Sequence, residues 1–261
     1  MIARFLLILS LCLATSCATG GQSNIPDLST EPWRATRAGT VGVALVTGVA
    51  SGYEVDSTVN VVAANFGDPV SLHGDMVGRY GVGVQGEYYP IDDLMLFLGA
   101  ERRAFEPDLG EEAISFGEAS QNEIFIGMRY FLPYRFLKSQ RLRAFVQAKL
   151  AYIPSVEFEM ESRLEFDPPL NDAVLVSPYS GSDYWSIGAG AGFAYQYSDS
   201  VLLSFGFFYE LPLGASEGRS AASLKEATGN SFVDNILDQL EYDVELEPRG
   251  WISFLRLSYA F

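Results

Sequence analysis

Three features of the sequence carry residue types that could do chemistry. Residues 81–86 read Gly-Val-Gly-Val-Gln-Gly, the glycine spacing with which a strand–turn–helix unit holds a pyrophosphate. His73 stands between Ser71 and Asp75, and a histidine oriented by a carboxylate can activate a serine hydroxyl as a nucleophile. Several acidic stretches offer carboxylate oxygens, the ligands that Ca²⁺ and Mg²⁺ prefer.

Each of these features has a simpler explanation. A pyrophosphate loop needs a helix after its glycines, but residues 87–90 (Glu-Tyr-Tyr-Pro) continue a strand into a turn. Ser, His, Gly and Asp are common turn residues, which explains Ser71, His73 and Asp75 as part of a polar loop. The acidic stretches lack the Asp-x-Asp-x-Asp-Gly spacing of a calcium loop, and a single His argues against a transition-metal site. We therefore expect no catalytic residue, no metal and no cofactor.

The composition describes an apolar and acidic protein. The chain has 261 residues, of which 48% are hydrophobic and 13% aromatic. Its 33 Asp and Glu against 17 Lys and Arg give a formal net charge of −16. A chain this apolar is not disordered. Nucleic acid is excluded as an expected partner, because phosphate binding needs clustered Lys and Arg.

The N-terminus has the pattern of a secretory signal peptide over residues 1–17. A basic residue precedes a short apolar run at 5–13, and small residues follow it. Cys17 stands where a bacterial lipoprotein signal places its lipidated cysteine. The alternative is ordinary cleavage after Ser16 or Ala18, in which case Cys17 carries no lipid.

The rest of the chain, residues 39–261, repeats one strand pattern after an expected flexible leader at residues 18–38. Apolar or aromatic residues alternate with small or polar ones, which is the period of a β-strand. Each segment is about as long as the roughly 9 to 11 tilted residues with which a strand crosses a bilayer. Eight such segments occur, at residues 40–50, 77–89, 93–104, 121–132, 142–153, 184–197, 201–211 and 250–261.

One face of these strands is apolar, and the other mixes glycine with charge. In the segment 201–211, for example, Leu203, Phe205 and Phe207 share the apolar face. A soluble sheet hides such a face in its core, whereas a transmembrane barrel turns it toward lipid. The opposite face then lines a lumen, whose charged residues by this register are Arg79, Glu87, Glu101, Arg103, Glu123, Arg129, Arg143, Lys149, Glu210 and Arg256.

The connections between the strands sort by length and by charge. Long connections, which carry most of the acidic residues, alternate strictly with short turns. Such sorting is expected when all long loops lie on one side of a membrane and all turns on the other. The long connections are predicted as loops at residues 52–76, 105–120, 154–183 and 212–249.

The end of the chain resembles the C-terminal signal by which bacterial outer-membrane β-barrels are recognised for assembly. Leu255, Leu257, Tyr259 and Phe261 alternate on one face, and the chain ends on an aromatic residue. With the signal peptide and the eight strands, the chain resembles the small outer-membrane barrels of the OmpA/OmpX type, and it is expected to lack the C-terminal periplasmic domain of the two-domain OmpA layout. The resemblance implies an all-β, eight-stranded antiparallel up-and-down transmembrane β-barrel, in which the first strand pairs with the last.

The resemblance also implies a location and partners. The barrel is expected in the outer membrane of a Gram-negative-type bacterium, with its termini and turns in the periplasm and its long loops outside. Outer-membrane lipid, lipopolysaccharide and the barrel assembly machinery are then its partners, and the acidic loops offer a surface to an external partner. A weaker hypothesis is that loop carboxylates share Mg²⁺ or Ca²⁺ with lipopolysaccharide phosphates.

The expected lumen points to a role without catalysis. Eight strands leave a lumen just wide enough for side chains to fill, and its charges should pair because an isolated buried charge costs several kcal/mol. This predicts a plugged, salt-bridged barrel with a structural or surface-interaction role. Room for the long side chains would come from the lumen glycines Gly81, Gly83, Gly188, Gly190 and Gly192.

Two other functions and one loop element stay open. The first alternative is a narrow small-solute channel. The second is a lipid A-modifying enzyme that uses His73, because outer-membrane lipid A palmitoyltransferases carry essential residues at the outer rim of an eight-stranded barrel. Residues 231–241 have helical spacing, with Asn230 or Ser231 as a candidate cap. Such a helix could pack on the barrel mouth, act as a lid or contact a partner.

Overall fold

The structure is a computed structural model of the chain. It describes residues 33–61, 70–108, 114–135 and 141–261, and it describes side chains in these ranges except at 50–79, 106–116 and 134–135. The expected signal peptide, Cys17 and residues 18–32 of the expected leader lie outside the described residues.

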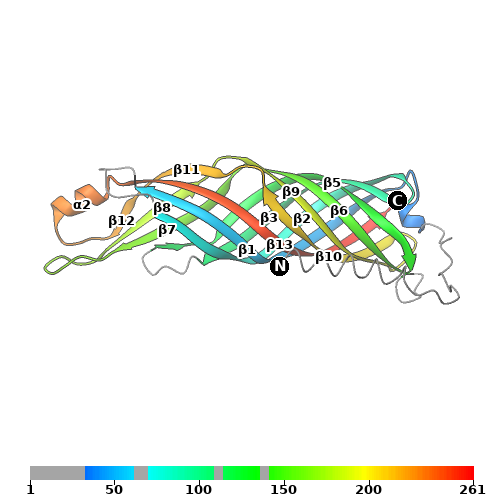
Figure 1. The fold of residues 1–261 in the computed structure, drawn as a ribbon, viewed down its shortest axis with the longest axis horizontal. Helices are drawn as coiled ribbons and strands as arrows, with labels where there is room; N and C mark the ends of the chain where they lie inside the picture. The colour runs from blue at the N-terminus through cyan, green and yellow to red at the C-terminus, as the bar shows by residue number, and fades with distance from the viewer. Residues whose placement is uncertain (1–32, 62–69, 109–113, 136–140) are drawn as a thin grey trace, which may run out of the picture. The chain divides into compact units, whose positions relative to one another are not determined.

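Eight long strands form a closed antiparallel ring (Figure 1). Each strand pairs with the ring strands before and after it along the chain. The ring closes between its first and last strands, whose register runs from Gly42 opposite Ala260 to Val61 opposite Tyr242. The predicted eight-stranded up-and-down barrel is therefore confirmed. In order, the ring strands are β1 (Val41–Val61), β2 (Val70–Ile91), β3 (Leu94–Asp108), β5 (Ala119–Arg135), β6 (Leu142–Ile153), β9 (Tyr184–Gln196), β10 (Val201–Pro212) and β13 (Glu241–Ala260).

The outer face of the ring is apolar, as the alternation predicts. Leu45 is 62% exposed and Leu98 60%, although both are large aliphatic residues that a soluble protein would bury. Aromatic residues border this face. Near the long connections Trp251 packs against Tyr209, with ring centroids 5.1 Å apart. Near the turns lie the exposed side chains of Tyr88, Tyr130, Tyr195, Tyr197 and Tyr259. An apolar band between two aromatic girdles is the outer surface of a barrel that faces lipid.

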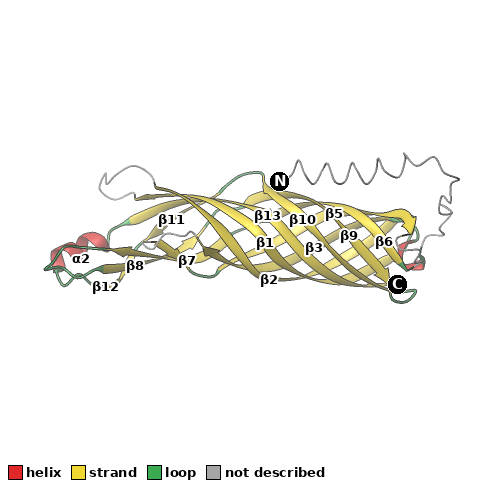
Figure 2. Ribbon diagram, turned by 60° about the horizontal axis from the view of Figure 1, so that its bottom comes forward, coloured by secondary structure: helices red, strands yellow, loops and turns green. Residues whose placement is uncertain are grey.

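The long connections are largely β-structure, so the prediction of loops there is wrong. β1 and β2 continue well into the predicted loop at 52–76, and β13 begins inside the predicted loop at 212–249. Additional strands extend the sheet beyond the ring (Figure 2). They are β4 (Ile114–Phe116), β7 (Val156–Leu164), β8 (Ala173–Ser180), β11 (Ser216–Ala221) and β12 (Ser223–Glu226).

These added strands enclose a small core of their own. We call β7, β8, β11, β12, the helix α2 (Ser231–Leu237) and residues 241–247 of β13 the loop extension. Inside it, the rings of Phe158 and Tyr179 stack with centroids 4.3 Å apart. Tyr179 donates hydrogen bonds from its hydroxyl to the carbonyl oxygens of Ser216 and Val244. Burial raises the pKa of Tyr179 to about 12, because a phenolate would lose its hydration there.

The strand β13 shows why these segments were mistaken for loops. Its even-numbered residues face inward along the whole strand. At 242–246 the inward residues are apolar and the outward ones acidic, whereas from Trp251 to Tyr259 the outward residues are mostly apolar and the inward ones include Arg256. The period of two is the same, but the polarity of the two faces is reversed. The outward apolar residues therefore end where the membrane ends, although the strand itself continues beyond it.

The predicted helix in the last long connection is confirmed over Ser231–Leu237. Asn230 caps it, because its side chain accepts a hydrogen bond from the backbone N–H of Phe232. Leu237 is buried, whereas Phe232 is 73% exposed. No helix in the described part of the chain is long and apolar enough to cross a membrane.

The last residues of the expected leader pack against the turn end of the barrel instead of being free. Arg34–Thr36 form a 3₁₀ helix, and the preceding Trp33 is only 5% exposed. The Thr36 hydroxyl donates to Asp93 Oδ1 over 2.8 Å, and the Asp93 N–H donates to the Thr36 carbonyl. Asp93 has a positive φ of 61°, a conformation that Asp tolerates in a tight turn. This segment closes the turn end of the lumen.

Candidate functional site in the barrel lumen

The structure turns nine of the ten predicted lumen charges inward and buries them. Each of the nine is at most 8% exposed. The tenth, Arg79, has a side chain outside the described residues, and its backbone lies where the register between β2 and β3 shifts, between Gly78 and Tyr80. Eight of the nine buried residues form two groups, which we call the loop-side and turn-side clusters, and the ninth, Arg143, pairs with Asp93 at the turn end.

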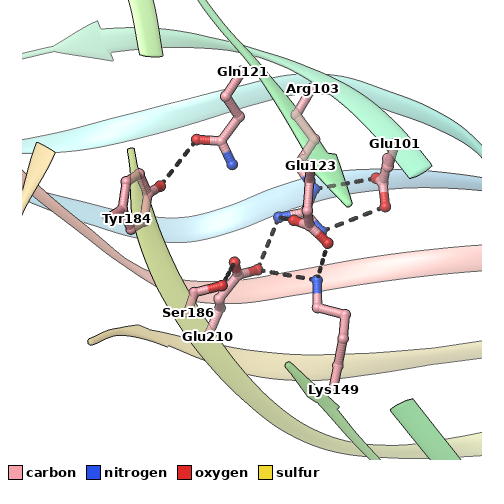
Figure 3. Close-up of polar contacts among 8 residues, drawn as sticks. All are labelled: Glu101, Arg103, Gln121, Glu123, Lys149, Tyr184, Ser186 and Glu210. Carbon is pink, nitrogen blue, oxygen red and sulfur yellow. Dashed lines mark hydrogen bonds and ion pairs between the residues drawn. The ribbon is translucent and has the colours of Figure 1, made fainter. Parts of the chain in front are cut away.

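The loop-side cluster consists of Glu101, Arg103, Glu123, Lys149 and Glu210 (Figure 3). Arg103 bridges three carboxylates, at 3.2 Å from Glu101, 2.9 Å from Glu123 and 2.8 Å from Glu210. The Lys149 ammonium lies 2.6 Å from Glu123 and 3.5 Å from Glu210. Three carboxylates and two cations leave this cluster with one formal negative charge.

The turn-side cluster consists of Glu87, Arg129 and Arg256. Arg256 is completely buried and donates from Nε to Glu87 Oε1 over 2.7 Å. The Ser258 hydroxyl donates to the other oxygen of Glu87 over 2.6 Å. Arg129 donates from Nε and Nη2 to the side-chain oxygen of Gln147. One carboxylate and two guanidiniums leave this cluster with one formal positive charge.

The remaining pair joins the barrel wall to a turn. Arg143 lies 2.7 Å from Asp93 and stacks over the Trp33 ring, with its guanidinium carbon 4.7 Å from the ring centroid. The sequence interpretation placed Asp93 at the start of the segment 93–104 and did not count it among the lumen charges, so it missed this partner. In the structure Asp93 lies in the turn before β3 and has the same parity as the inward residues Met95 and Phe97.

The sequence interpretation also missed five lumen phenylalanines that pair with glycines. In the strand register, Phe97 faces Gly127, Phe125 faces Gly99, and Phe145 faces Gly192. Phe208 and Phe254 face Gly190 and Gly206 in the same way. A Cβ atom added to Gly192 would lie only 2.6 Å from the Cζ atom of Phe145. Of the predicted lumen glycines, Gly190 and Gly192 thus make room for rings, whereas Gly81 and Gly83 make room for Glu101.

These side chains fill the lumen almost completely between the two clusters. A cavity of about 30 Å³ lies there, lined by residues of both clusters and by the rings of Phe97, Phe125, Phe208 and Phe254. A water molecule needs roughly 10 to 15 Å³ of such space, so the cavity holds about two waters. It is far too small for a nutrient or a drug-sized ligand.

The other sequence features lie away from the lumen chemistry. Residues 81–86 are inside β2 and are followed by strand, which confirms that they form no phosphate loop. His73 also lies within β2, opposite Asp56, so the interpretation of residues 71–75 as part of a polar loop is wrong. The described residues contain no cluster of three or more His, Cys, Asp or Glu side chains placed to hold a metal ion.

The outward face of the loop extension is acidic and carries like charges side by side. Glu217 lies directly opposite Glu245 in the pairing of β11 with β13, and both are exposed. Like charges in directly opposed positions destabilise a sheet. Arg219 neutralises part of the same face through a bond of 2.7 Å to Asp243.

The closed ring and its apolar belt define the class of the protein as an outer-membrane β-barrel. No family model matches the chain, and no curated protein matches it in sequence. Its fold matches the crystal structure of the outer membrane protein OprG from Pseudomonas aeruginosa with a TM-score of 0.52 and 13% identity, over 88% of this chain and 99% of that one.

Two further solved structures are more distant. The outer membrane protease OmpT from Escherichia coli matches with a TM-score of 0.40 and 11% identity, over 90% of this chain and 100% of that one. The N-terminal β-barrel domain of OprF from Pseudomonas aeruginosa matches with a TM-score of 0.36 and 11% identity, over 86% and 98% of the two chains. Neither of these two resemblances bears on function.

Proposed function

We propose that the protein is a non-catalytic outer-membrane barrel with a closed lumen, which presents the loop extension as a binding surface. The filled lumen is the observation that carries this proposal. Ion pairs, aromatic rings and a cavity of about 30 Å³ occupy the space in which a channel would need a continuous path.

The energetics of the lumen support a barrel that stays closed. A solute passing through would have to separate Arg103 from Glu123 and Glu210, all of which are buried. Removing one partner from a buried ion pair costs about 3–5 kcal/mol, because the remaining charge is left without compensation. The rings of Phe125 and Phe208 lie against Lys149 and restrict its movement.

We expect purified, refolded protein to give no steady current in planar lipid bilayers. The filled lumen offers no water path, so the membrane conductance should remain at the level of protein-free bilayers. A steady single-channel current would contradict the closed lumen and favour the narrow-channel alternative. In that case a change of ion selectivity in Glu210→Gln would locate the path through the loop-side cluster.

The structure of the loop extension supports its proposed role as a binding surface. Its own core, including the stacked rings of Phe158 and Tyr179, holds its strands in place. Its outward face keeps Glu217 opposite Glu245 even though this arrangement costs stability. A rigid acidic surface has the charge complementarity that recruits a basic partner.

We expect a fluorescent nonaarginine peptide to bind the protein in nanodiscs at low salt. The variant Glu217→Gln/Glu245→Gln should weaken this binding several-fold, because it removes two adjacent charges from the acidic face. The control Glu165→Gln/Asp167→Asn removes two exposed charges from the β7–β8 connection and should change the affinity less than twofold. Equal weakening by both variants, or by neither, would refute a binding role for the β11–β13 face.

A further inference from the structure

Arg129 is a buried cation without a carboxylate partner. Its side chain is 2% exposed, and its Nη1 atom has no hydrogen-bond acceptor among the described residues. The other described lumen cations, by contrast, each lie within 4 Å of a carboxylate. Arg129 stacks over Phe145 at 4.2 Å and over Phe254 at 5.4 Å, and Gln147 is its only hydrogen-bond partner among the described residues.

The charges around Arg129 do not compensate it. The turn-side cluster holds a second cation, Arg256, and its one carboxylate, Glu87, is paired with Arg256. Glu87 is already engaged by Arg256, Ser258 and Gln85. Stacking on aromatic rings recovers only part of the free energy that a buried cation loses when it has no counter-charge.

Arg129 borders the lumen cavity. The cavity of about 30 Å³ is lined by the cations Arg129, Lys149 and Arg256 and by one carboxylate, that of Glu101. The amides of Gln85 and Gln147 also line it, and each has N–H groups that can donate to an anion. The volume suits a bare monatomic ion with a water molecule and excludes sulfate, phosphate or an organic acid with its first hydration shell.

We infer that this cavity binds one small monovalent anion, of the chemistry of chloride, next to Arg129. The anion would accept from Arg129 Nη1 and neutralise the positive charge of the turn-side cluster. Because most of the residues that line the cavity are buried, the ion would be taken up as the barrel folds. The site would stabilise the closed lumen without taking part in transport.

The test compares thermal unfolding of protein refolded in sodium chloride and in sodium gluconate at equal ionic strength. Gluconate is too large for the cavity, so only chloride should raise the melting temperature, by about 2–4 °C at saturation. Arg129→Met should abolish this difference. The control Arg143→Met removes a lumen arginine that also stacks on an aromatic ring but has a carboxylate partner, and it should keep the chloride effect.

Two results would overturn the inference. One is a wild-type melting temperature that is the same in chloride and in gluconate. The other is an equal rise with chloride in the wild type and in Arg129→Met, which would point to a surface effect. If Arg129→Met does not refold, the test uses crystals of wild-type protein refolded in sodium bromide, in which the anomalous signal of bromide is measured. An anomalous peak beside Arg129 supports the site, and ordered solvent without anomalous signal refutes it.

Discussion

Replacing Arg256 with Met is expected to lower the free energy of unfolding by about 3–5 kcal/mol. Arg256 is fully buried and is the only cation within 4 Å of Glu87 among the described residues. Its loss leaves a carboxylate in the lumen without a counter-charge, which is the costly outcome for a buried ion pair. Urea unfolding of the refolded barrel in lipid vesicles, followed by tryptophan fluorescence, measures the change.

The double variant Arg256→Met/Glu87→Met separates loss of the pair from loss of packing. Exchanging both charges for apolar side chains of similar length is often neutral for a buried ion pair. We therefore expect the double variant to recover most of the stability that Arg256→Met loses. If the double variant is as unstable as the single one, Arg256 acts through its contacts with Ser204 and Met95 and not through Glu87.

Gly127→Val should also destabilise the barrel strongly, by about 3 kcal/mol. Gly127 faces Phe97 in the register of β3 and β5. A Cβ at this position would overlap the Cζ atom of Phe97 and the carbonyl oxygen of Ala148. Overpacking of this kind typically costs about 1–3 kcal/mol and more where backbone must move. Urea unfolding in vesicles should show a lower midpoint.

Gly86→Val is the matched control for this prediction. Gly86 is also in the middle of a ring strand, but it faces outward, and the nearest atom to an added Cβ is the Leu98 carbonyl oxygen at 3.8 Å. A valine there adds apolar surface toward lipid and meets no obstacle. Equal destabilisation by Gly127→Val and Gly86→Val would show that the effect comes from strand conformation and not from the Phe97 ring.

The ring strands and their two faces could be predicted because lipid imposes a simple rule. Most outward positions in the membrane are apolar, so the residues on that face, such as Leu203 and Leu257, mark a strand and its register together. The same register then placed the buried charges, including Arg103 and Glu123, on the inner face. The expected pairing of the first strand with the last is present between β1 and β13.

The pairs that form between side chains inside the lumen could not be predicted. The alternation of residues assigns each side chain to one face of the sheet, but it does not identify the side chain that it contacts. Arg143 pairs with Asp93, which lies in a turn, and Arg129 donates hydrogen bonds to Gln147 instead of to a carboxylate. The inward phenylalanines were missed because the inner face was expected to be polar. Their signal was available in the alternation, which places Phe145 between the inward residues Arg143 and Gln147.

The reversal of polarity along β13 fixes how deep the barrel sits. From Trp251 to Tyr259 the outward face meets lipid, and eight steps of about 3.4 Å, tilted by about 40°, cover roughly 21 Å. Immediately beyond Trp251 the outward face carries Arg249 and Glu247. A shift of the barrel by two residues in one direction would place these charges in the hydrocarbon layer. A shift in the other direction would move Trp251 out of contact with lipid. In a thicker bilayer the protein therefore has no freedom to shift, and the surrounding lipid must thin to match it.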